Sequence, residues 1–173
     1  SSHFDLYELP NKAELLETYI NRFSKRISFR DRIQIAKSLA QTFSQLHEIN
    51  VAHRDISETS IWTGHDLNLL VSRWLASAFP EGKTVGDLRA FLHSGRTVAP
   101  EDAFDVPSDP YKRDVFLLAR VIHFIFSGTQ LPVNDGVAEY ETIDTSLFAG
   151  EESTVLAELD AILKRSLSWE PDE

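Results

Sequence analysis

A long amphipathic segment is the feature that most limits how this chain can fold. From Phe29 to Ile49, apolar side chains recur every three or four positions, the period of one face of a helix about five to six turns long. The stripe consists of Phe29, Ile33, Ala36, Leu39, Ala40, Phe43, Leu46 and Ile49. Ser28, with Asp31 three residues later, is typical of an N-cap followed by an acidic first turn. The pattern predicts a long helix with one buried face.

Three further helices are predicted from similar patterns. Residues 13–23 carry apolar side chains on one side of a helix. Residues 113–126 are apolar nearly all round, which predicts a buried helix, and Gly128 follows as a stop signal. A last helix fits residues 154–168, ahead of Pro171.

Extended structure is predicted to be sparse. Residues 61–63 and 67–71 are short β-type runs, and Gly64-His65-Asp66 between them favours a hairpin turn. Residues 4–9 are compatible with another short strand. The sequence therefore predicts one mainly α domain over residues 1–173, with a small β-hairpin.

Composition narrows the classes of function and partner. The net charge of −10 argues against nucleic acid and an anionic membrane as partners, because phosphate binding needs Lys and Arg. The absence of Cys excludes disulfides, thiolate metal sites and a Cys nucleophile. The longest apolar run, residues 115–126, contains Arg120 and His123 and is too short to span a bilayer. We expect a cytoplasmic protein.

A distinctive motif, His53-Arg54-Asp55, follows the long helix and precedes the predicted strand at 61–63. It resembles the protein-kinase catalytic loop, H-R-D-x-x-x-x-N, with Ser60 at the Asn position and Ser57 where the family usually carries Lys. We call residues 51–60 the HRD loop. Because a tripeptide alone is a weak signal, the resemblance depends on the order of further motifs.

Those further motifs resemble the C-terminal lobe of the protein-kinase fold. Residues 4–10 are similar to the hinge strand, and Ala99-Pro100-Glu101 matches the A-P-E that closes the activation segment. Asp114 opens a run similar to D-V-W-S-x-G, and residues 167–171 resemble the segment before the family's late Arg. The resemblance implies a C-lobe without its phosphate-covering N-lobe, which would be supplied in cis or replaced by a protein partner. As the chain has no Met, we expect a piece of a longer protein, trimmed at both ends.

The resemblance implies roles for three residues of the HRD loop, and each has a simpler alternative. Asp55 matches the catalytic base, and its alternative is an acceptor that shapes the loop. His53 matches a buried spine residue, and its alternative is a packed core histidine. Arg54 matches the residue that meets a phosphorylated activation segment, and its alternative is an ion pair with a local carboxylate. Candidate phosphoacceptors are Thr84, Ser94 and Thr97.

Two residues outside the loop are expected to be structural. The resemblance implies that Asp114 accepts backbone N–H bonds from the HRD loop. It also implies that Glu101 is buried and pairs with the family's late Arg. Arg113 or another cation would have to replace that Arg here, because a buried unpaired carboxylate is costly.

The positions that bind metal in the family lack their usual ligands. Ser60 replaces the Asn, and the D-F-G position is Ser72-Arg73-Trp74 or Val71-Ser72-Arg73, neither of which contains a carboxylate. An Arg at this point opposes a divalent cation by like-charge repulsion. Trp62 matches the floor of the adenine pocket, where it either fills the pocket or packs into the core. We therefore expect no metal site and no bound cofactor.

These observations favour a kinase-like lobe with a regulatory or scaffolding role, that is, a pseudokinase. One alternative is an active serine/threonine kinase that uses ATP and Mg²⁺ with displaced ligands. Another is a helical interaction module unrelated to kinases. The sequence contains neither H-E-x-x-H nor G-x-S-x-G, so a zinc protease and a serine hydrolase are disfavoured.

Overall fold

Helices dominate the computed structural model, so the mainly α fold class is confirmed. The structure describes residues 12–23, 26–64, 67–80, 98–104, 109–134, 137–144, 146, 148 and 151–168. The helices are α1 (Leu16–Phe23), α2 (Phe29–Glu48), α4 (Pro100–Phe104), α5 (Pro110–Ser127) and α6 (Glu151–Leu167), with a 3₁₀ turn at Trp74–Ala76. The strands are β1 (Glu14–Leu15), β2 (Ile61–Thr63), β3 (Leu69–Val71), β4 (Val133–Asn134) and β5 (Val137–Ala138).

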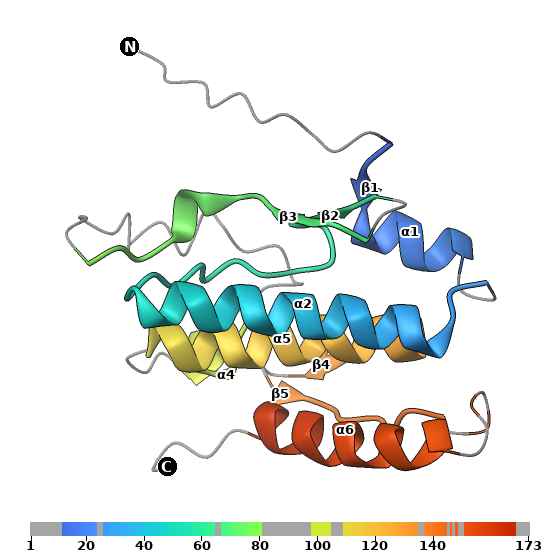
Figure 1. Ribbon diagram of the computed structural model, residues 1–173. Coiled ribbons are helices and arrows are strands. Elements are labelled where there is room, and N and C mark those ends of the chain that lie inside the picture. The colour runs from blue at the N-terminus through green and yellow to red at the C-terminus, as the bar shows by residue number, and fades with distance from the viewer. Residues whose placement is uncertain are drawn as a thin grey trace.

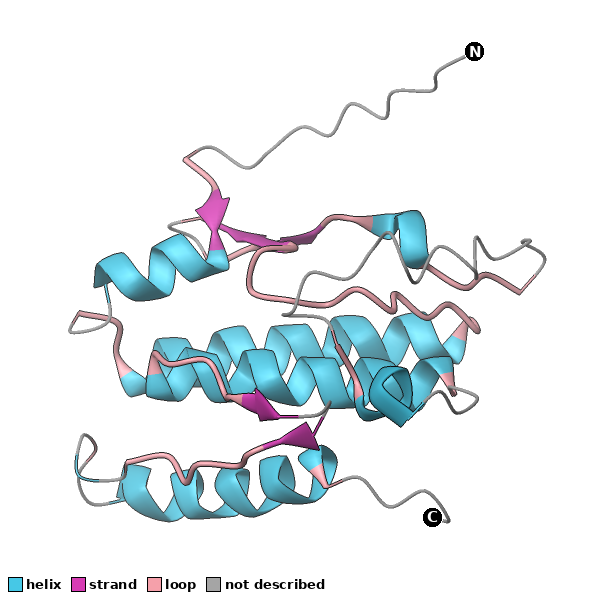
Figure 2. Cartoon of the chain, turned by 180° about the vertical axis from the view of Figure 1, so that it is seen from behind, coloured by secondary structure: helices cyan, strands magenta, loops and turns pink. Residues whose placement is uncertain are grey.

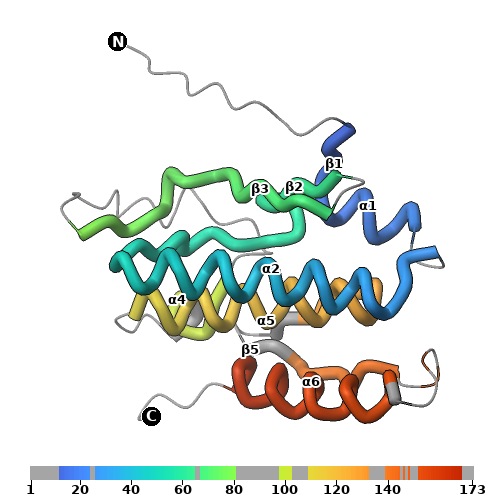
Figure 3. The backbone as a smooth tube through the Cα atoms, in the orientation of Figure 1, coloured from blue at the N-terminus to red at the C-terminus, as the bar shows by residue number. Residues whose placement is uncertain are grey.

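The elements stack in layers around two central helices (Figure 1). Helices α2 and α5 lie side by side, and the small sheet with α1 lies on one side of them. Helix α6 packs against α5 on the other side, as the view from behind also shows (Figure 2). The tube shows that α5 runs antiparallel to both α2 and α6 (Figure 3).

Local capping signals set the ends of the two central helices. Ser28 caps α2 by accepting a hydrogen bond from Asp31 N at 3.1 Å, as predicted. Helix α5 begins three residues earlier than predicted because Asp109 caps it and Pro110 fits the first helical position. Gly128 ends α5 in the left-handed conformation, with φ of 72°, and its N–H donates to Phe124 O.

The sheet differs from the sequence prediction at its first strand. Strands β2 and β3 form the expected antiparallel hairpin, with Trp62 opposite Leu70. Residues Glu14–Leu15, predicted as helix, instead form β1 and pair with β2, so that Leu15 lies opposite Trp62. This pairing joins distant parts of the chain, so helical periodicity could not reveal it. The predicted strand at residues 4–9 lies outside the described part of the chain.

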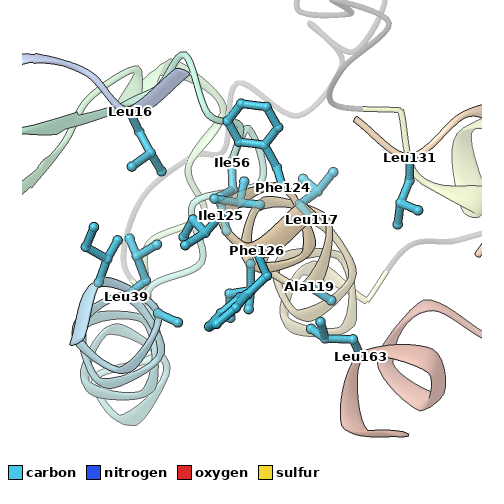
Figure 4. Close-up of a cluster of buried hydrophobic side chains, with 14 of the residues drawn as sticks. Leu16, Leu39, Ile56, Leu117, Ala119, Phe124, Ile125, Phe126, Leu131 and Leu163 are labelled. Atoms are coloured by element: carbon cyan, nitrogen blue, oxygen red, sulfur yellow. The ribbon is translucent and has the colours of Figure 1, made fainter. Parts of the chain in front are cut away.

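Helix α5 forms the centre of the hydrophobic core. It is buried on nearly all sides, as its apolar sequence predicted. Figure 4 shows its side chains between Leu39 of α2 and Leu163 of α6. Its buried apolar residues are Phe116, Leu117, Ala119, Val121, Ile122, Phe124, Ile125 and Phe126. Every helix in the described part of the chain is too short or too polar to cross a bilayer.

Candidate functional site

The HRD loop lies between the small sheet and helix α2, and the N-terminal part of α5 anchors it (Figure 1). Asp114 of α5 is 1% exposed, and its carboxylate accepts His53 N at 2.7 Å and Arg54 N at 2.6 Å. These are the backbone hydrogen bonds expected for this residue. His47, near the end of α2, adds a contact of 3.1 Å from Nε2 to Asp114 Oδ2. One carboxylate therefore joins α2, α5 and the loop.

His53 is a buried histidine whose two ring nitrogens both have partners. Its Nε2 lies 2.8 Å from Ser72 O, and its Nδ1 lies 3.2 Å from Asp55 N. A neutral ring that carries its proton on Nε2 satisfies both contacts at once. Burial lowers the pKa of His53, which favours this neutral form. The ring packs edge-on against Trp74, with centroids 4.7 Å apart, so His53 links the loop to the segment after β3.

The Asp55 carboxylate, at the expected catalytic position, forms an ion pair with Arg73. Arg73 Nη2 lies 3.0 Å from Asp55 Oδ2, and the side chains are 37% and 3% exposed. Arg73 Nη1 also lies 3.4 Å from Thr59 Oγ1. The sequence had indicated an Arg near the metal-binding position, but it did not identify Arg73 as the partner of Asp55. A cation therefore already lies against the residue that would act as the base.

Ser60, which the kinase resemblance places at the Asn position, is fully buried, and its hydroxyl hydrogen-bonds within the loop. Its Oγ donates to Ser57 O at 2.9 Å and accepts from Ser57 N at 2.9 Å. Its carbonyl accepts from the backbone N–H and the hydroxyl of Ser72, at 2.8 and 2.9 Å. The hydroxyl thus closes a tight turn, and its hydrogen is directed at a carbonyl.

Ser72 and Trp62 connect the two strands that follow the loop. The indole N–H of Trp62 lies 3.3 Å from Ser72 Oγ, and that hydroxyl itself donates to Ser60 O. Trp62 is half-buried, while its strand neighbours Ile61 and Thr63 are buried, so the indole points to the opposite face of the sheet. Ser72, predicted at the lost metal position, makes these contacts within the sheet, while the next residue reaches Asp55.

Arg113 connects the loop to helix α4 through an acidic residue other than the predicted Glu101. Its Nε donates to Arg54 O at 2.9 Å, and its Nη1 lies 2.6 Å from Asp102 Oδ2. Sequence reasoning had offered Arg113 as a substitute partner for Glu101, but its ion pair is with Asp102. Glu101 Oε2 is buried and makes no hydrogen bond to the residues that the structure describes. The predicted phosphoacceptors for Arg54 lie outside those residues.

Comparison with known proteins adds no relative to this picture: neither the protein-family models nor the curated proteins gave a match. Among the described residues, no group of three or more His, Cys, Asp or Glu side chains gathers in a way that could hold a metal ion.

Proposed function

We propose that this chain is the C-terminal lobe of a kinase-like protein, with a regulatory or scaffolding role in place of phosphoryl transfer. The frame around Asp114 supports the kinase-like part. A buried helix carries an Asp beneath the HRD loop and accepts two of its backbone N–H groups. A helical module with accidental motif matches would not be expected to join His53, Asp114 and the loop in this way.

The ion pair between Asp55 and Arg73 supports the part of the proposal that replaces phosphoryl transfer with another role. A catalytic base has to receive the proton of a substrate hydroxyl, so its carboxylate must be open to the substrate. Here a guanidinium lies 3.0 Å from that carboxylate. The pairing opposes both the approach of a hydroxyl and the binding of a second cation.

The surrounding residues do not fit the magnesium ion that the kinase resemblance implies. Mg²⁺ prefers oxygen ligands in octahedral geometry and is usually held in part by carboxylates. The Ser60 hydroxyl is committed to Ser57, and the Ser72 hydroxyl is committed to Ser60 O. Arg73 supplies positive charge where a carboxylate would be needed. We therefore derive no chemical step through a metal ion.

Nucleotide binding tests this proposal directly. We expect no thermal shift with ATP, with or without Mg²⁺ or Mn²⁺, and no phosphate transfer from labelled ATP to protein substrates. A ligand present at about 100 times its Kd would stabilise the fold by about 2.7 kcal/mol, a shift of several degrees. The proposal would be wrong if transfer occurred and Asp55→Asn abolished it. Glu152→Gln, at an exposed position of α6, controls for the loss of a carboxylate.

A further inference from the structure

Helix α6 is the outermost layer of the described structure, and α5 is the element it mainly contacts (Figure 1). Its inner face consists of the buried side chains of Leu156, Leu163 and Leu167, and Figure 4 shows Leu163 next to the core. Two large apolar side chains lie off this face: Val155 is 44% exposed and Ile162 is 50% exposed. Helix α6 therefore presents apolar side chains beyond those that its own fold buries.

These exposed side chains belong to a continuous stripe on α6. Val155, Leu159 and Ile162 are spaced at i, i+4 and i+7, which places them on one face of the helix. Leu159 and Ser166, which follows Ile162 by one turn, are half-buried. We call these four residues the α6 stripe. Their spacing is that of the a and d positions of a coiled coil, where one helix packs against another.

Two exposed charges of opposite sign flank the α6 stripe on one side. Glu158 and Arg165 are seven residues apart, so they lie on the same edge of the stripe. Among the described residues, neither side chain forms an ion pair. If a second α6 packed antiparallel on the stripe, this edge would meet the same edge of the second helix. Glu158 of each copy would then face Arg165 of the other.

A parallel arrangement lacks this complementarity. It would set the Glu158 edge of one helix against the opposite edge of the other helix. That opposite edge carries Leu156 and Leu163, which are buried in the core of their own copy. The charges of α6 are therefore complementary to a second α6 in the antiparallel direction.

We propose that the α6 stripe binds the α6 stripe of a second copy of this chain, with the two helices antiparallel. Leu159 of each copy then faces Ile162 of the other, and Val155 faces Ser166. The same surface serves both copies, as in a two-fold symmetric dimer. A contact between two helices of 17 residues is at the small end of specific interfaces, and the net charge of −10 on each copy opposes association. We therefore expect a dissociation constant in the micromolar range.

Sedimentation equilibrium over a wide range of protein concentration tests for this dimer. The wild-type protein should pass from monomer to dimer, and Ile162→Glu should remain a monomer because it places a charge within the stripe. Ala157→Glu is the matched control, since it adds the same charge at an exposed position of α6 outside the stripe, and it should dimerise like the wild type. Circular dichroism checks that each variant is folded, and Ile162→Ser replaces Ile162→Glu if that variant is not.

Exchanging the flanking charges tests the direction of the two helices. Glu158→Arg alone or Arg165→Glu alone sets like charges against each other twice, and either should weaken the dimer by about tenfold. The double variant Glu158→Arg with Arg165→Glu should recover the wild-type affinity, because the pairs are restored with their signs reversed.

The absence of Cys from the chain allows a direct reading of the register. Val155→Cys mixed with Ser166→Cys should form a disulfide between the two variants on mild oxidation. Either variant alone should not, because its two thiols would lie about 16 Å apart along the helices, too far for a disulfide. A wild-type protein that stays monomeric, or a dimer that Ile162→Glu or Ile162→Ser leaves intact, would overturn the proposal. So would a double charge exchange that fails to restore affinity.

Discussion

Asp114→Asn is the substitution that best tests how the HRD loop is held. The carboxylate is almost fully buried, and its two oxygens accept His53 N, Arg54 N and the ring of His47. An amide of the same shape keeps one acceptor oxygen and replaces the other with an NH₂ group. At least one buried backbone N–H would then face a donor in place of an acceptor.

The expected cost follows from the bonds that are lost. A hydrogen bond to a charged group contributes about 1.5 to 3 kcal/mol, and a buried donor left unpaired costs about 1 to 3 kcal/mol. These terms overlap, so we expect Asp114→Asn to lower the free energy of unfolding by about 3 kcal/mol. In a domain of this length that corresponds to a fall in Tm of about 6 to 12 °C.

Urea unfolding followed by circular dichroism measures this change, and the same helix provides the control. Asp109 is an exposed N-cap of α5 whose carboxylate accepts Tyr111 N at 2.8 Å. Asn caps helices about as well as Asp, so Asp109→Asn should change stability by only a few tenths of a kcal/mol. Equal, small effects at both positions would refute the view that Asp114 anchors the loop.

Further predictions concern helix ends and protonation. Ser28→Ala removes the oxygen that accepts Asp31 N and should cost about 1 kcal/mol in urea unfolding, whereas Ser28→Asn should restore most of it. At Gly128 an added Cβ would meet nothing within 4 Å. Gly128→Ala should therefore lower the free energy of unfolding only by the strain of a φ of 72°, about 1 kcal/mol, and a much larger loss of stability would contradict this. Burial lowers the pKa of both His53 and His123 from 6.5, so below that pH the unfolded chain binds protons that the folded chain does not. The free energy of unfolding should therefore be highest above pH 6.5 and should fall on acidification, by up to about 1.4 kcal/mol per pH unit for each His. Urea midpoints measured between about pH 7.5 and 5.5 test this, and His123→Gln should reduce the slope of those midpoints against pH.

Local signals predicted α1, α2, α5 and α6 because the forces that form a helix act within a few residues, whereas the short helix α4 was not predicted. The stripe from Phe29 and the cap at Ser28 located α2, and Gly128 located the end of α5. The start of α5 was predicted too late because its apolar pattern begins after the capping residue Asp109. Strand β1 was missed because Leu15 pairs with Trp62, and no local pattern encodes a contact over that separation.

The candidate site shows the same limit among its side chains. The order of motifs was enough to indicate that Asp114 bonds to the backbone of the HRD loop. The pairing of Arg73 with Asp55 depends on a left-handed backbone turn, which the sequence around an Arg does not reveal. The sequence suggested Glu101 as the partner of Arg113, and the structure instead pairs Arg113 with the adjacent Asp102.

The contacts of the HRD loop show that its residues have different requirements: some satisfy backbone hydrogen bonds, and Asp55 needs a partner for its charge. His53 and Asp114 satisfy backbone groups, so they stabilise the loop whether or not the protein carries out a reaction. The kinase-like motif can therefore stabilise the fold in a protein that has no catalytic activity. Asp55 is different, because a catalytic role needs its carboxylate open to a substrate, whereas the fold needs only that its charge be matched. Arg73, 3.0 Å from Asp55, matches that charge and lies against the carboxylate, and this contact is the observation on which the proposed non-catalytic role depends.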